Sequence, residues 1–252
     1  MNTTCARAAA VALLAVLMTA TATDTALAEA APPVETGSDE SRLTARVVVV
    51  PGENWTTRMK VAFVSVKKGP QCAVWIETED GEYVATLTAT ARTAENEWRA
   101  APEEGRPESL PVWSAARARG NGGAAGTSGA ADGVDAVSSA TPMEGVEGSR
   151  SGIVLKPGAP YVVRCEVNHS FDYNDAWPKK AKPGDARYSG VNGQPSLVYE
   201  GRFVAGTDAS VDLVPVGTGS VDGSSGGMTA GFEGMTSALS IIGSIRVILA
   251  AE

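Results

Sequence analysis

The chain has 252 residues, a formal net charge of −8 and a sequence pI near 4.8. No cluster of lysines and arginines stands out along the sequence as a phosphate-neutralising surface, and an acidic chain is repelled by nucleic acid and by anionic lipid headgroups. Nucleic acid is therefore not an expected partner. Two long Gly-rich stretches limit the foldable part to a single domain of ordinary size.

The N-terminus predicts a secretory signal peptide over residues 1–28. Arg7 precedes an apolar run over residues 8–18, which is too short to cross a bilayer as a helix. Ala-Leu-Ala at 26–28 supplies the small-x-small pattern for cleavage before Glu29. Cys5 lies ahead of the apolar run, so the thiol of a lipoprotein anchor is missing there. We expect a periplasmic or secreted protein with no stable membrane insertion, and a disordered segment over residues 29–41.

Short apolar and β-branched runs dominate the rest of the chain, and no segment outside the signal peptide reads as an amphipathic helix. Glu79-Asp80-Gly81-Glu82 predicts a tight hairpin between two runs. The sequence predicts an all-β fold, an antiparallel two-sheet, immunoglobulin-like sandwich with long Gly-rich loops, formed by one domain over residues 42–252. The expected strands cover residues 43–50, 60–66, 72–77, 83–89, 161–167, 197–204 and 241–249.

Two segments lack the apolar side chains that would offset the entropy of ordering them. Residues 120–133 read GNGGAAGTSGAADG, and a similar Gly/Ser stretch covers residues 217–234. We expect flexible inserts at 114–134 and 217–236. The apolar run over 238–251 carries Arg246 and is short for a membrane span, so it predicts a closing strand.

Cys72 and Cys165 each lie within a predicted buried strand of the mature chain. Two interpretations stay open at this point: a disulfide formed in an oxidising compartment, or two separate buried thiols that pack as small apolar side chains.

Several short motifs occur in a consistent order along the chain. They are QCAVWIE at 71–77, DGEYVATL at 80–87, RPESLPVWS at 106–114, DAVSSATP at 135–142 and YVVRCEVNHSFDYN at 161–174. With these motifs the chain resembles the predicted periplasmic proteins of domain-of-unknown-function family 2271, in patches over roughly residues 60–205. The resemblance implies an extracytoplasmic β-sandwich found with PepSY-type membrane proteins and flavin transferases. Ser139 stands where that family usually has glycine.

The segment from Asp135 to Thr141 also resembles the acceptor sequence on which periplasmic flavin transferases place FMN. The resemblance implies a phosphoester to the Thr141 hydroxyl, beside the small residues Ser138, Ser139 and Ala140, with Asp135 orienting the loop or being read by the transferase. A modifying enzyme needs an exposed, unhindered loop, and small neighbours suit that need. Trp113 is a candidate for shielding the flavin ring. The alternative is that these residues are ordinary loop composition beside a low-complexity insert.

Oxygen-bearing side chains crowd the segment that follows the strand at 161–167. Asp172, Asn174 and Asp175 are candidate Ca²⁺ ligands, because carboxylate and amide oxygens suit that ion. The EF-hand spacing is incomplete, and Asx turns that end the strand are the alternative.

Hydrolysis is disfavoured by the sequence. His169 is the only histidine, Ser170 is adjacent to it and would point to the other face of a strand, and no G-x-S-x-G motif exposes another serine. One histidine and two strand cysteines also make a poor zinc site. The leading hypothesis is an electron carrier with covalently bound FMN. A non-enzymatic binding or structural module and a calcium-stabilised domain are the alternatives.

Overall fold

A computed structural model describes residues 40–61, 64–94, 106, 108–120, 137–138 and 143–252 of the chain. The predicted signal peptide and residues 29–39 of the predicted disordered segment lie outside this part. Within the described residues, no helix combines the length and the apolar character that crossing a membrane requires.

The first and last strands of the described chain pair with each other. Antiparallel register joins Leu43 to Ala251 and Val47 to Val247, and alternate residues of the first strand are buried. This period-two burial is typical of a strand with one face on a core. The sheet has the order β10-β12-β1-β7. Its strands are β1 (Ser41–Pro51), β7 (Val146–Leu155), β10 (Ala209–Asp212) and β12 (Ile242–Ala251).

A second sheet has six strands in the order β11-β9-β8-β4-β5-β6. All neighbours are antiparallel except β5 and β6, which run parallel. The strands are β4 (Gln71–Thr78), β5 (Tyr83–Thr90), β6 (Val137–Ser138), β8 (Pro160–Asn168), β9 (Leu197–Val204) and β11 (Val214–Thr218).

The two sheets share one hydrophobic core. Leu43 and Val47 of β1 belong to the same buried cluster as Val74 and Ile76 of β4 and Val163 of β8. The fold is therefore all-β and sandwich-like, as the sequence predicts. The described residues between 40 and 252 belong to one compact unit.

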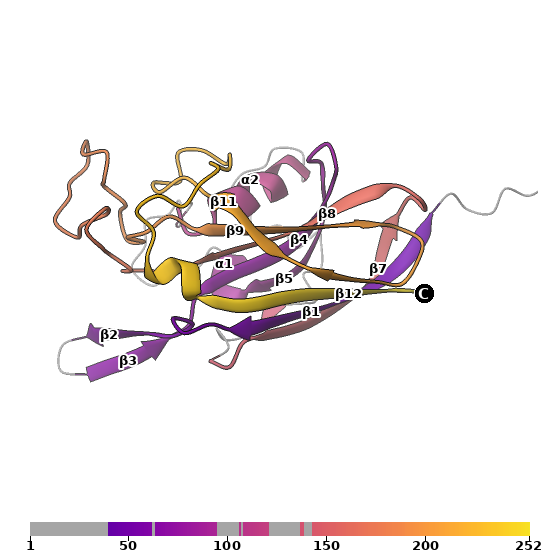
Figure 1. Cartoon of the computed structure of the whole chain (residues 1–252), viewed down its shortest axis with the longest axis horizontal. Helices are drawn as coiled ribbons and strands as arrows, with labels where there is room; N and C mark the ends of the chain where they lie inside the picture. The colour runs from indigo at the N-terminus through magenta and orange to yellow at the C-terminus, as the bar shows by residue number, and fades with distance from the viewer. Residues whose placement is uncertain (1–39, 62–63, 95–105, 107, 121–136, 139–142) are drawn as a thin grey trace, which may run out of the picture. The chain divides into compact units, whose positions relative to one another are not determined.

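A helix covers the outer face of the six-stranded sheet (Figure 1). It is α2 (Pro111–Gly120), and Trp113 packs in a second cluster with Ala73 and Trp75 of β4. Both faces of β4 are thus buried, which explains its unbroken apolar run. The expectation of no helix is wrong here, and so is that of a flexible insert over residues 114–120. The rest of that insert, 121–134, lies outside the described residues.

Residues 57–68 form a separate two-stranded hairpin, with β2 (Thr57–Val61) antiparallel to β3 (Val64–Lys68). The single strand expected over 60–66 is wrong, because the hairpin turn falls inside it. No glycine or proline marks the turn, so the apolar run reads as continuous.

Six of the seven expected strands are confirmed: they correspond to β1, β4, β5, β8, β9 and β12. The remaining elements are the short helices α1 (Ala91–Ala94) and η1 (Ser237–Ser240). The stretch at 217–236 is tethered, because Thr218 and Thr229 exchange two backbone hydrogen bonds of 2.8 Å and Met235 is buried.

Candidate functional site

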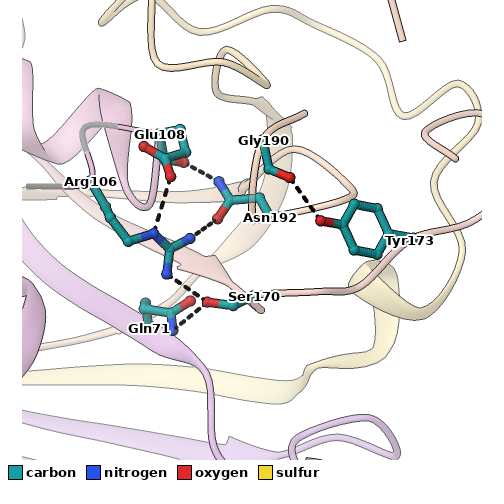
Figure 2. A network of polar contacts seen from close by, with 7 residues as sticks. All are labelled: Gln71, Arg106, Glu108, Ser170, Tyr173, Gly190 and Asn192. Atoms are coloured by element: carbon teal, nitrogen blue, oxygen red, sulfur yellow. Dashed lines mark hydrogen bonds and ion pairs between the residues drawn. The ribbon is translucent and has the colours of Figure 1, made fainter. Parts of the chain in front are cut away.

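A buried arginine ties together loops and strand ends beside β4 and β8 (Figure 2). The Arg106 side chain is only 8% exposed, and its Nε lies 3.0 Å from a carboxylate oxygen of Glu108. Nη1 donates to Ser170 Oγ at 2.8 Å, and Nη2 donates to Asn192 Oδ1 at 2.6 Å. A guanidinium group with donors in a fixed fork suits this role, because it can satisfy several acceptors at once.

Further contacts extend this network along the same edge of the molecule. Gln71, the first residue of β4, donates from Nε2 to Ser170 Oγ at 3.3 Å, and Asn192 donates from Nδ2 to the backbone oxygen of Glu108. Tyr173 donates its hydroxyl to the Gly190 carbonyl at 2.7 Å (Figure 2). The segment after β8 is therefore held in a defined position.

Two buried polar atoms at these strand ends have no partner among the described residues. They are Gln71 Oε1 and Asn168 Nδ2, and their residues are neighbours across β4 and β8. Because most buried polar atoms in native proteins are hydrogen-bonded, such exceptions mark places where water or a ligand fits.

A lysine and an aromatic ring meet at the surface of this region. Lys68, the last residue of β3, places Nζ 5.5 Å from the ring centroid of Phe171. Phe171 is 47% exposed and has a φ of 66°. Burial, together with the nearby charges of Arg106 and Arg92, lowers the pKa of Lys68 to about 8. The sequence gives no sign of this cluster, because its cations come from separate segments.

Two residues of the predicted flavin-acceptor segment lie at the edge of the six-stranded sheet. Val137 and Ser138 form β6, whose backbone pairs with Ala89 and Thr90 at the end of β5. Asp135, Ser139, Ala140 and Thr141 lie outside the described residues, so their predicted role stays a prediction.

Trp113 is not available as a stacking partner for a flavin in this structure. It is 2% exposed, donates its ring nitrogen to Thr86 Oγ1 at 2.9 Å, and lies beneath the Arg117 guanidinium at 5.3 Å. The expectation that Trp113 shields the flavin ring is therefore wrong, because the Trp113 side chain is buried between α2 and the sheet.

The candidate calcium ligands take part in local hydrogen bonds. Asp172 accepts from Ser237 at 2.6 Å and from Gln194 at 2.8 Å. Asn174 Oδ1 accepts from the backbone of Ala176 and Trp177, which is the Asx-turn arrangement.

Asp175 is exposed, and no group of three or more His, Cys, Asp or Glu side chains suited to a metal ion occurs in the described part of the chain. Calcium binding stays a prediction.

Cys72 and Cys165 lie side by side in the core. Their sulfur atoms are 3.6 Å apart, and both residues are free thiols with almost no exposure. Burial, reinforced by Cys72, raises the pKa of the Cys165 thiol. The distance exceeds an S–S bond of about 2.05 Å, so the two sulfurs are in contact without being bonded.

His169 and Glu166 show how the end of β8 is fixed. His169 Nε2 lies 3.0 and 3.1 Å from the carbonyl oxygens of Asn54 and Trp55, so this nitrogen carries a proton. Burial lowers the pKa of His169. Its ring therefore anchors the chain ahead of the hairpin formed by β2 and β3.

Glu166 is a buried carboxylate that sequence reasoning missed. It accepts hydrogen bonds from the backbone of Val112 at 3.3 Å and Trp113 at 2.8 Å, and from Ser196 Oγ at 2.5 Å. Burial raises its pKa to about 7, against the lowering effect of these three bonds. The signal in the sequence is a single acidic residue inside an otherwise apolar strand. Its position at the start of α2 favours a structural role in holding that helix.

No segment of the chain matches a protein-family model, and neither a curated protein nor a solved structure is found to be similar to it.

Proposed function

We propose that this chain is an exported accessory protein of an extracytoplasmic redox system and carries FMN covalently on Thr141. The observation that supports the proposal most directly is the position of β6. It is a two-residue strand at the edge of the six-stranded sheet, and it ends three residues before Thr141. A segment leaving the edge of a sheet can be reached by a second enzyme without disturbing the core.

Loading is a phosphoryl transfer catalysed by a separate flavin transferase. The Thr141 oxygen forms a bond to the phosphorus of the FMN half of a flavin dinucleotide, the pyrophosphate P–O bond breaks, and the adenylate leaves. The hydroxyl proton passes to a base of the transferase. When attached, the flavin would supply two-electron redox chemistry between a PepSY-type membrane partner and an electron acceptor, so the chain itself would need no nucleophile or base for a substrate.

We also propose that the two sheets form an immunoglobulin-like sandwich. An immunoglobulin-like sandwich is supported by the antiparallel pairing within each sheet and by the core that the two sheets share. Periplasmic or secreted localisation is supported by the signal-peptide pattern over residues 1–28.

Mass spectrometry tests the modification. The mature protein, produced by export beside a flavin transferase, should gain the mass of one FMN phosphoester on the peptide that contains Thr141. Thr141→Ala should abolish the gain. Thr127→Ala, which removes a similar hydroxyl from the neighbouring Gly-rich stretch, should leave it unchanged.

A fully unmodified Thr141 peptide under these conditions contradicts the redox proposal. The alternative is then a non-enzymatic binding or structural module that recognises a partner through its loops. The loops fixed by Arg106 favour that alternative, since its hydrogen bonds to Ser170 and Asn192 hold them in a defined position.

A further inference from the structure

Three basic residues from separate segments lie close enough to interact electrostatically, in a chain whose net charge is negative. Residues 54–76 contain Arg58, Lys60, Lys67 and Lys68 and no acidic residue. Arg92 and Arg106 act electrostatically on Lys68 from two other segments. Neighbouring cations repel one another, so an anion placed among them is stabilised.

The aromatic ring beside Lys68 is held in an unusual backbone conformation. A φ of 66° is rare for a bulky residue and is strained relative to an ordinary conformation. Phe171 is kept there by a 2.6 Å hydrogen bond from its backbone nitrogen to the Val191 carbonyl and by the bonds of Ser170 with Arg106. Phe171 is also 47% exposed, and backbone strain of this kind is concentrated at functional sites.

We propose that Lys68, Arg92 and Phe171 form a binding site for a planar ring that carries a phosphate group. The ring stacks on the exposed part of Phe171, and the phosphate lies between the Lys68 amine and the Arg92 guanidinium. Arg106 contributes through its charge and by fixing Ser170, because its own donors are engaged with Glu108, Ser170 and Asn192. We call Lys68, Arg92 and Phe171 the Lys68 site.

Two ligands share this chemistry: the FMN group proposed on Thr141, and a free nucleotide. The first rests on the proposed function. Ser138 pairs with Thr90, two residues before Arg92, so β6 ends close in the sheet to the start of α1, which carries Arg92. Thr141 is three residues further on, and three residues of extended chain span at most about 11 Å.

Fluorescence titration of the mature protein, prepared without a transferase, tests the site. FMN should bind at least about tenfold more tightly than riboflavin, which has the same ring and lacks the phosphate. Lys68→Gln should remove that difference. Lys67→Gln is the matched control, because Lys67 is the adjacent residue of the same strand and its side chain is exposed. Phe171→Leu should weaken both ligands about equally, because it removes the stacking surface and leaves the charges.

Equal affinities for FMN and riboflavin would contradict the proposed site. Equal effects of Lys68→Gln and Lys67→Gln on the affinity for FMN would contradict it as well. Circular dichroism of each variant confirms that it is folded. Protein with a loaded Thr141 separates the two sources: loss of FMN binding identifies the attached flavin as the occupant, whereas unchanged binding identifies a free nucleotide. If the site binds FMN but mass spectrometry finds Thr141 unmodified, the proposed function is contradicted and the Lys68 site is not.

Discussion

Glu166 is a buried side chain whose charge state affects the stability of the fold. It is completely buried, it accepts three hydrogen bonds, and its pKa of about 7 lies above the ordinary value of 4.5. The folded state therefore holds this proton more tightly than the unfolded chain does. The contribution of the group to stability is greatest below pH 4.5 and is lost as the pH rises to about 7.

The wild-type protein should accordingly become less stable between these pH values, by an amount on the order of 3 kcal/mol. Glu166→Gln should remove this pH dependence, because an amide does not ionise. Denaturant unfolding at pH 5, 6, 7 and 8 measures the free energy of unfolding of both proteins as a function of pH. Glu147→Gln, at a position 72% exposed, should keep the wild-type profile. His169, whose pKa is lowered by burial, acts in the opposite sense and is present in both proteins. A stability difference between wild type and Glu166→Gln that stays constant over this range would contradict the prediction.

At the scale of elements, the strands with one or both faces in the core could be predicted from the sequence. β1 and β12 alternate, and β4 is continuously apolar because α2 covers its second face. β7 could not be predicted, since its sequence VEGSRSGIVL contains two glycines, two serines and two charged residues. It is a strand because it pairs with β1 along most of its length, and tertiary pairing of this kind overrides local preference.

The helix and the candidate site were missed for a related reason. α2 spans only ten residues, and four of them are buried: Pro111, Val112, Trp113 and Ala116. Its position depends on Glu166, which lies more than 50 residues away in the chain. The Lys68 site likewise joins segments that are distant in sequence, and no local pattern marks such a meeting of cations.

The loop after β11 offers a test of how closely the elements approach one another. A Cβ added to Gly219 would lie 2.8 Å from both Glu166 Oε1 and Pro111 Cγ and closer still to Ser196 Oγ. Gly219→Ala should therefore destabilise the protein by about 1–3 kcal/mol, as overpacking does. Thermal unfolding measures the effect. Gly227→Ala is the control, since a Cβ there meets only Ser225 Oγ at 3.2 Å. Equal melting temperatures of the two variants would show that the loop is loosely held.

At the scale of the whole molecule, the cysteine pair reports the compartment in which the chain folds. Cys72 and Cys165 are buried in the folded state, so an oxidase can reach them only before the core has closed over β4 and β8. We expect an exported chain to form the disulfide at that stage, because the fold brings the sulfurs into contact.

Mass spectrometry after alkylation in denaturant tests this expectation. Exported protein should show no alkylated Cys72 or Cys165 unless it is first reduced, and reduction should destabilise it by up to about 4–5 kcal/mol. The same chain expressed without residues 1–28 in a reducing cytoplasm provides the control, with both cysteines alkylated. Two reactive thiols in the exported protein would instead support the interpretation of separate buried thiols.

The pairing of β1 with β12 has a consequence for how the chain reaches its final state. β12 lies in the middle of its sheet, between β10 and β1. β1 is synthesised first of these strands and β12 last, so β1 lacks one of its two neighbours until β12 has been synthesised. Contacts of such long sequence separation form slowly. A polypeptide threaded through a secretion channel from its N-terminus would remain open throughout the passage and close only when its final strand arrives.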